Sequence, residues 1–84
     1  MARQSWLHLP PPSACRVLWE DGELYLNEEW VGSVGPRREG EVGSCATWLR
    51  GRGWDDARHR TVAEAQAALI ERVAREIGAE GGEV

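Results

Sequence analysis

The stretch that decides the fold runs from Thr61 to Ile77 and reads TVAEAQAALIERVAREI. Its apolar residues recur at helical spacing and gather on one side: Val62, Ala65, Leu69, Ile70, Val73 and Ile77. Charged residues gather on the opposite side: Glu64, Glu71 and Arg75. This pattern predicts an amphipathic helix, whose apolar face must be covered by another part of the chain.

Both ends of this helix carry recognisable signals. Thr61 and Glu64 predict a capping box, in which the Thr61 hydroxyl accepts from the Glu64 amide and the Glu64 carboxylate accepts from the Thr61 amide. Gly78 is predicted as the C′ residue that ends the helix. Residues 79–84 are then expected to form a flexible tail.

A β-hairpin is predicted around Asp21-Gly22, which lies between two alternating apolar runs. A two-residue loop would set the register of the strands at residues 16–20 and 23–26. This register places four side chains on the face that the helix would cover: Val17, Trp19, Leu24 and Leu26. Leu18 and Tyr25 would lie on the other face.

Two more strands are predicted after this hairpin. Asn27, Glu28 and Glu29 form a second turn, and residues 30–34 form a third strand. Because Asn-Glu is a weaker hairpin signal than Asn-Gly, the register leaves open whether Trp30 or Val31 faces the helix. Residues 44–50 alternate as a fourth strand, between loops at 36–43 and 51–56. Residues 57–60 are expected to add a brief extended piece.

The predicted fold class is therefore α+β. An antiparallel sheet of three to four strands is covered on one face by a single C-terminal amphipathic helix. The domain would span residues 16–78. Residues 1–15 would form an extended N-terminal arm, in which Pro10, Pro11 and Pro12 favour the polyproline II conformation.

Composition places the chain among ordinary globular domains. Its 84 residues are 42% hydrophobic and 29% charged, with a net charge of −4 and no apolar run that could span a membrane. No signal peptide is recognisable, so we expect a cytoplasmic protein with Cys15 and Cys45 as free thiols. Five Trp in a chain without Phe are large amphipathic anchors that must be buried or face a partner.

No motif indicates catalysis, a metal or a cofactor. The residues with metal-binding chemistry lack the paired spacing of a zinc site: His8, Cys15, Cys45 and His59. Gly51-Arg52-Gly53 precedes Trp54 and two aspartates, which would repel phosphate. We therefore expect a protein that is not an enzyme and holds no cofactor or metal.

Acidic residues at the two hairpin ends predict one acidic edge of the sheet. This edge is either an ordinary solvated rim or a surface that engages a basic partner. Together with the aromatic residues of the outer sheet face, it forms the candidate protein interface: Glu20, Asp21, Glu23, Tyr25, Glu28, Glu29 and Trp30.

A second candidate surface combines arginines with tryptophans, as nucleic-acid sites do. Its members are Arg37, Arg38, Trp48, Arg50, Arg52, Trp54, Arg58 and Arg60. Four acids intervene between these arginines and the whole chain is acidic, so binding to a phosphate backbone would be weak. The alternative is a solvated surface of paired charges.

Three segments between residues 16 and 78 give the chain a family resemblance: ELYLNEEWVGSV, CATWLR and TVAEAQAALIERVAREIG. In architecture and composition it resembles small accessory proteins of phages and prophages, including anti-CRISPR proteins. The resemblance implies an inhibitor that binds a host protein complex, such as a CRISPR effector, and blocks recognition or cleavage of target DNA. It assigns no functional residue. The alternatives are a nucleic-acid-binding module and a structural homodimer assembled on the outer face of the sheet.

Overall fold

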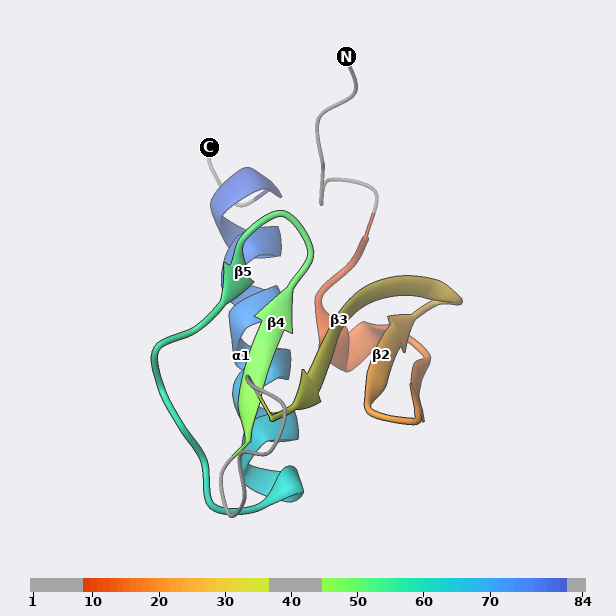
Figure 1. Ribbon diagram of the computed structural model, residues 1–84. Coiled ribbons are helices and arrows are strands. Elements are labelled where there is room, and N and C mark those ends of the chain that lie inside the picture. The colour runs from red at the N-terminus through yellow and green to blue at the C-terminus, as the bar shows by residue number, and fades with distance from the viewer. Residues whose placement is uncertain (1–8, 37–44, 82–84) are drawn as a thin grey trace.

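One antiparallel sheet of five strands packs against a single C-terminal helix in the computed structural model, which describes residues 9–36 and 45–81 (Figure 1). A short 3-10 helix, η1, precedes the sheet. The elements are η1 (Pro12–Ala14), β1 (Val17–Glu20), β2 (Glu23–Leu26), β3 (Glu29–Gly35), β4 (Ala46–Leu49), β5 (Gly53–Trp54) and α1 (Val62–Gly81). The strands lie side by side in chain order. The predicted α+β class is confirmed, and β5 is a strand beyond the three to four predicted.

The first hairpin has the predicted register. Trp19 pairs with Leu24 and Val17 with Leu26, across a turn whose two residues both have positive φ, 52° at Asp21 and 82° at Gly22. Two positive φ values define the turn type whose twist matches that of the flanking strands.

The second hairpin settles the register that the sequence left open. Asn27 and Glu28, with φ of 51° and 72°, form another two-residue turn, so β3 already begins at Glu29. Tyr25 pairs with Trp30, but Leu24 pairs with Gly32, which leaves Val31 as an extra residue in a β-bulge. As a result Val31 is fully buried towards the helix, while Trp30 lies on the other face.

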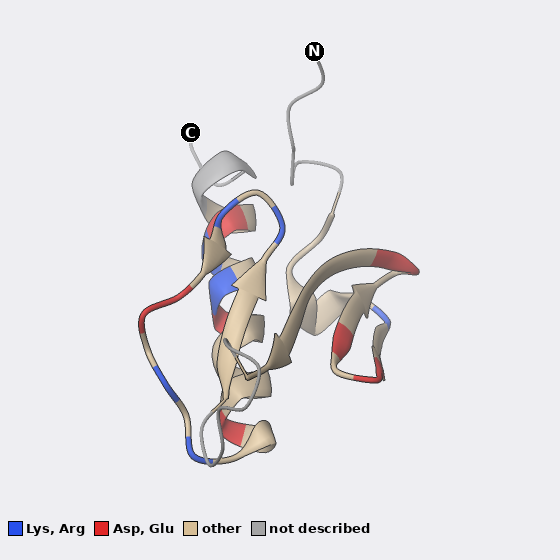
Figure 2. Cartoon of the chain, in the orientation of Figure 1, with Lys and Arg blue, Asp and Glu red and all other residues tan. Residues whose placement is uncertain are grey.

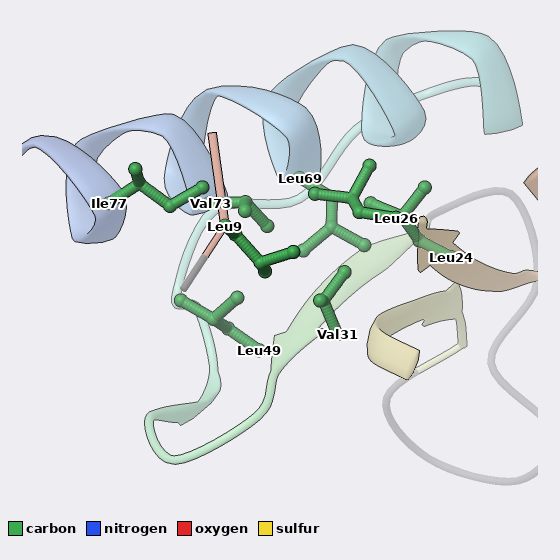
Figure 3. Close-up of a cluster of buried hydrophobic side chains, with 8 residues drawn as sticks. All are labelled: Leu9, Leu24, Leu26, Val31, Leu49, Leu69, Val73 and Ile77. Atoms are coloured by element: carbon green, nitrogen blue, oxygen red, sulfur yellow. The ribbon is translucent and has the colours of Figure 1, made fainter. Parts of the chain in front are cut away.

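The core lies between α1 and the sheet and is built from eight apolar side chains. Figure 3 shows three of them on α1 pointing towards the strands, with a residue from the N-terminal segment among them. The cluster consists of Leu9, Leu24, Leu26, Val31, Leu49, Leu69, Val73 and Ile77.

The helix covers less of the sheet than predicted. It packs mainly against β3 and β4 and not against the edge strand β1. Val17, predicted to face the helix, is 40% exposed, whereas Trp19 packs partly against the core. Val62, predicted on the apolar face, is 53% exposed, because the first turn of α1 lies past the end of the strands (Figure 1).

Both helix ends differ in detail from the prediction. The Glu64 amide donates to Thr61 Oγ1 at 3.1 Å as expected, but Glu64 Oε1 accepts from the Arg60 amide, also at 3.1 Å, one residue before the expected donor. The helix continues through Gly78 to Gly81, so the predicted stop was wrong. A glycine inside a helix costs only about 1 kcal/mol relative to alanine, which the flanking turns outweigh.

The segment before β1 contributes to the core. Leu9 is 6% exposed, and η1 contacts α1. Pro11 has the predicted polyproline II geometry (φ −56°, ψ 151°), but the chain then turns into η1 with Pro12 buried, so the extended conformation ends there. Cys15 Sγ donates to the Pro10 carbonyl at 3.4 Å, and burial raises the pKa of this thiol.

A polar contact also joins the helix to the sheet. Arg72 Nη1 donates to both the carbonyl and the hydroxyl oxygen of Thr47, each at 2.9 Å. Thr47 is fully buried on β4, so this guanidinium satisfies a hydroxyl that has lost its contact with water.

Candidate interaction surface

The sheet face opposite α1 carries a row of aromatic side chains that crosses the strands. Because side chains alternate along a strand, the neighbours of the buried core residues point away from the helix. The registers then align these neighbours across β1 to β5. We call this surface the aromatic sheet face, and it consists of the aromatic residues Tyr25, Trp30, Trp48 and Trp54 together with Leu18 at the β1 end.

Stacking organises the middle of this row, and its two ends are the most open to solvent. The ring centroids of Trp30 and Trp48 are 5.4 Å apart, with 29° between the planes, within the range that aromatic pairs favour. Tyr25 and both of these rings are half-buried. Leu18 and Trp54, at the two ends, are 52% and 38% exposed.

Polar contacts hold Trp30 in place. Its Nε1 donates to Glu23 Oε1 at 2.6 Å, and its carbonyl accepts from Arg50 Nη1 at 2.7 Å. Arg50 also pairs with Glu29 at 2.8 Å, and the two side chains are only 16% and 31% exposed. Because the indole nitrogen and the backbone of Trp30 are both hydrogen-bonded, the side chain has little conformational freedom to lose when a partner contacts the ring.

The residues of the predicted protein interface do not form one acidic edge. Glu20 and Glu23 face each other beside the turn at Asp21, on the same side of the sheet as Tyr25 and Trp30. Glu28 and Glu29 lie at the other end of β2. There Glu28 is 3.3 Å from Arg16, and Glu29 pairs with Arg50.

The second predicted surface is also divided. Trp48 and Trp54 belong to the aromatic sheet face, whereas Arg37 and Arg38 lie outside the described residues. Arg50 pairs with Glu29, and Arg52 reaches both carboxylate oxygens of Glu76 on α1 at 3.0 and 3.2 Å.

The remaining two arginines of that surface, Arg58 and Arg60, are exposed on the segment between β5 and α1. Figure 2 shows acidic residues around the β1–β3 hairpins, whereas the chain on either side of β5 carries both basic and acidic residues, Asp55 and Asp56 among them.

The described residues offer no metal centre. They contain no group of three or more His, Cys, Asp or Glu side chains that could hold an ion. Cys45 and His59, both considered for zinc, meet through a backbone bridge, which places part of the predicted extended piece beside β4. Cys15 and Cys45 are free thiols. No described helix is both long and apolar enough to cross a membrane.

The sequence identified only part of the aromatic sheet face, because it left the orientation of Trp30 open and placed Trp54 in a loop. It placed Tyr25 on the outer face of the sheet, and it placed Trp48 on the face of its strand opposite to Thr47 and Leu49. The pairing of β3 with β4 and of β4 with β5 was missing, and only these pairings join Trp30, Trp48 and Trp54 into one row.

The fold and surface together define a small α+β protein with one aromatic sheet face. Comparisons with protein-family models, curated proteins and solved structures found no match.

Proposed function

We propose that this protein is a small non-catalytic protein-binding module whose aromatic sheet face contacts the partner. The observation that carries the proposal is the row of aromatic side chains, with Trp30 fixed by stacking and hydrogen bonds, on the sheet face opposite the only helix that packs on the described sheet. Tryptophan and tyrosine dominate the binding energy of protein interfaces because they bury large area at low entropic cost.

Charge favours a partner with a basic surface. Glu20, Asp21 and Glu23 lie beside the first turn, at the margin of the aromatic sheet face. Carboxylates around an apolar centre steer a positively charged partner into place and disfavour acidic ones.

The finer proposal follows from the resemblance to anti-CRISPR proteins. A CRISPR effector complex holds nucleic acid in a positively charged channel, and an acidic module with an aromatic centre fits such a surface. On this proposal the protein inhibits the complex by occupying it, in the host cytoplasm, without any chemistry of its own.

Binding of nucleic acid is the alternative that the arrangement supports less well. Exposed Trp54 and half-buried Trp48 are suited to base stacking. However, Arg50 and Arg52 are engaged by carboxylates, and the acids of the first turn would repel phosphate.

The proposal is tested by removing the indole ring at one end of the aromatic sheet face. Trp54→Ala is expected to weaken binding of the partner about thirtyfold, which corresponds to ~2 kcal/mol for an interface tryptophan. The tagged protein is used to capture proteins from host lysate, and each captured protein is purified for titration calorimetry. Purified effector complex is assayed in parallel for inhibition of target-DNA cleavage.

Val62→Ala is the matched control, because Val62 is 53% exposed but lies on α1. It should leave binding unchanged, and circular dichroism checks that both variants fold. Equal binding by Trp54→Ala and wild type would refute the proposed surface. A salt-dependent shift in the electrophoretic mobility of an oligonucleotide would favour the nucleic-acid alternative. An unaffected cleavage reaction would contradict only the proposal that the partner is a CRISPR effector complex.

A further inference from the structure

The two edges of the sheet are different. At one edge, β5 has only two residues, and the chain after it stays beside β4, where the Asp55 amide donates to the Thr47 carbonyl at 3.0 Å and His59 bridges Cys45. At the other edge, no strand of the described residues pairs with the outer side of β1. An edge strand with unpaired backbone groups is a template for another strand.

The hairpin determines which backbone groups of β1 are free to pair. The Arg16 carbonyl accepts from the Asn27 amide at 2.9 Å, so position 16 is directed towards β2. Because antiparallel pairing alternates, the backbone amides and carbonyls of residues 18 and 20 are directed towards β2 as well. The amides and carbonyls of Val17 and Trp19 therefore point outwards from the sheet.

The same strand is self-complementary when it is read in reverse. With a two-fold axis at Leu18, Val17 lies opposite the partner's Trp19 as a hydrogen-bonded pair. Arg16 then lies opposite the partner's Glu20, and Leu18 meets its own copy in the closer, non-hydrogen-bonded position.

Neighbouring registers place less favourable pairs of side chains opposite each other. An axis at Arg16 or at Glu20 places like charges opposite each other. An axis at Val17 or at Trp19 places Leu18 opposite a charged residue. The register centred on Leu18 thus combines apolar contact with two charge pairs of opposite sign.

We propose that two copies of this chain pair β1 with β1 in antiparallel orientation about a two-fold axis at Leu18. The joined sheets form one ten-stranded sheet. Pairing covers Val17 and Leu18, which are 40% and 52% exposed in the single copy. The paired strand also lies against a pocket of about 230 Å³ lined by Arg16, Val17, Leu18 and Glu28.

Of the aromatic sheet face, this dimer uses only Leu18 and leaves the four aromatic side chains to the protein partner. It brings the two aromatic sheet faces side by side on one surface, because Leu18 ends the row in each copy. The proposal is also independent of the proposed function, since dimerisation requires no other molecule. A four-residue strand makes a small interface, so the dissociation constant is expected in the micromolar range.

Complementary charge reversals test the register. Arg16→Glu gives a strand with two acids at these positions, and Glu20→Arg gives one with two bases. Each variant alone is expected to dimerise about tenfold more weakly than wild type, because like charges then face each other at both ends. An equimolar mixture of the two variants is expected to recover the wild-type dissociation constant as a heterodimer.

Sedimentation velocity over a concentration series gives these constants, and circular dichroism checks the fold of each variant. Arg75→Glu is the matched control, because Arg75 has a 70% exposed side chain on α1, and it should dimerise like wild type. The proposal is overturned if wild type remains monomeric up to about 1 mM, the weak end of measurable affinity. It is equally overturned if the mixture dimerises no better than the separate variants.

Discussion

Glu28 has a positive φ, a backbone conformation that glutamate rarely adopts. Three described non-glycine residues have positive φ, namely Asp21, Asn27 and Glu28. Asp and Asn tolerate this region because their short side chains bond the local backbone, whereas a longer side chain gains no such compensation. The strain at Glu28 accompanies the tight turn that places Trp30 and Val31 on opposite faces.

Replacement of Glu28 by glycine should stabilise the fold. Relief of this strain is expected to contribute ~1 kcal/mol, which raises the melting temperature of a domain of this size by about 4–8 °C. Loss of the exposed contact with Arg16 costs little. Glu28→Ala removes the same carboxylate but keeps a Cβ, so equal thermal melting curves for the two variants would contradict the explanation.

At the scale of elements, the seam between α1 and β4 depends on a polar contact within an apolar core. The Thr47 carbonyl also accepts from the Asp55 amide at 3.0 Å, but its hydroxyl is bonded by Arg72. Close packing beside this contact depends on Gly32 of β3, where an added Cβ would lie 2.5 Å from the Trp48 carbonyl oxygen on β4 and 3.2 Å from Leu69 Cδ1 on α1. The seam therefore tolerates neither added bulk nor an unpaired polar group.

Arg72→Met should test the polar part of the seam. The substitution keeps a long side chain but leaves the buried Thr47 hydroxyl without this donor, a loss of ~1–3 kcal/mol. Urea unfolding should show a lower midpoint with an unchanged slope.

Arg75→Met is the control for this measurement. Its weak pair with Glu71, at 3.8 Å between exposed side chains, contributes almost nothing. Equal midpoints for the two variants would show that the hydroxyl does not need the guanidinium.

Local signals explain which elements the sequence could predict. Asp21-Gly22 and the pair Thr61 and Glu64 act over four residues or fewer, so they define the first hairpin and the helix start without help from the rest of the chain. By contrast, β5 has only two residues, and its extended form depends on pairing with β4. A glycine-rich segment carries no local signal for such a strand.

At the scale of the whole molecule, the position of the helix could not be read from periodicity. Alternation correctly assigned Leu24 and Leu26 to the core, yet it assigned Val17 to the same face without showing how far the helix extends. Leu9 joined the core from a segment with no periodicity at all. The same limit applies to the aromatic sheet face, because alternation placed Leu18 and Tyr25 there, whereas Trp30 and Trp54 were placed only by the pairing of the strands.

The order of the strands has a consequence for how quickly the chain reaches this structure. Each strand pairs with the next one along the chain, so the contacts in the sheet close short loops. Folding slows as contacting residues lie further apart in sequence. We expect refolding followed by tryptophan fluorescence to finish within about a second in a single exponential phase, and a slow dominant phase would contradict this expectation.

During synthesis the hairpins leave the ribosome before α1 does. Leu24, Leu26, Val31 and Leu49 therefore remain without their cover until α1 has also left the ribosome and closes over them.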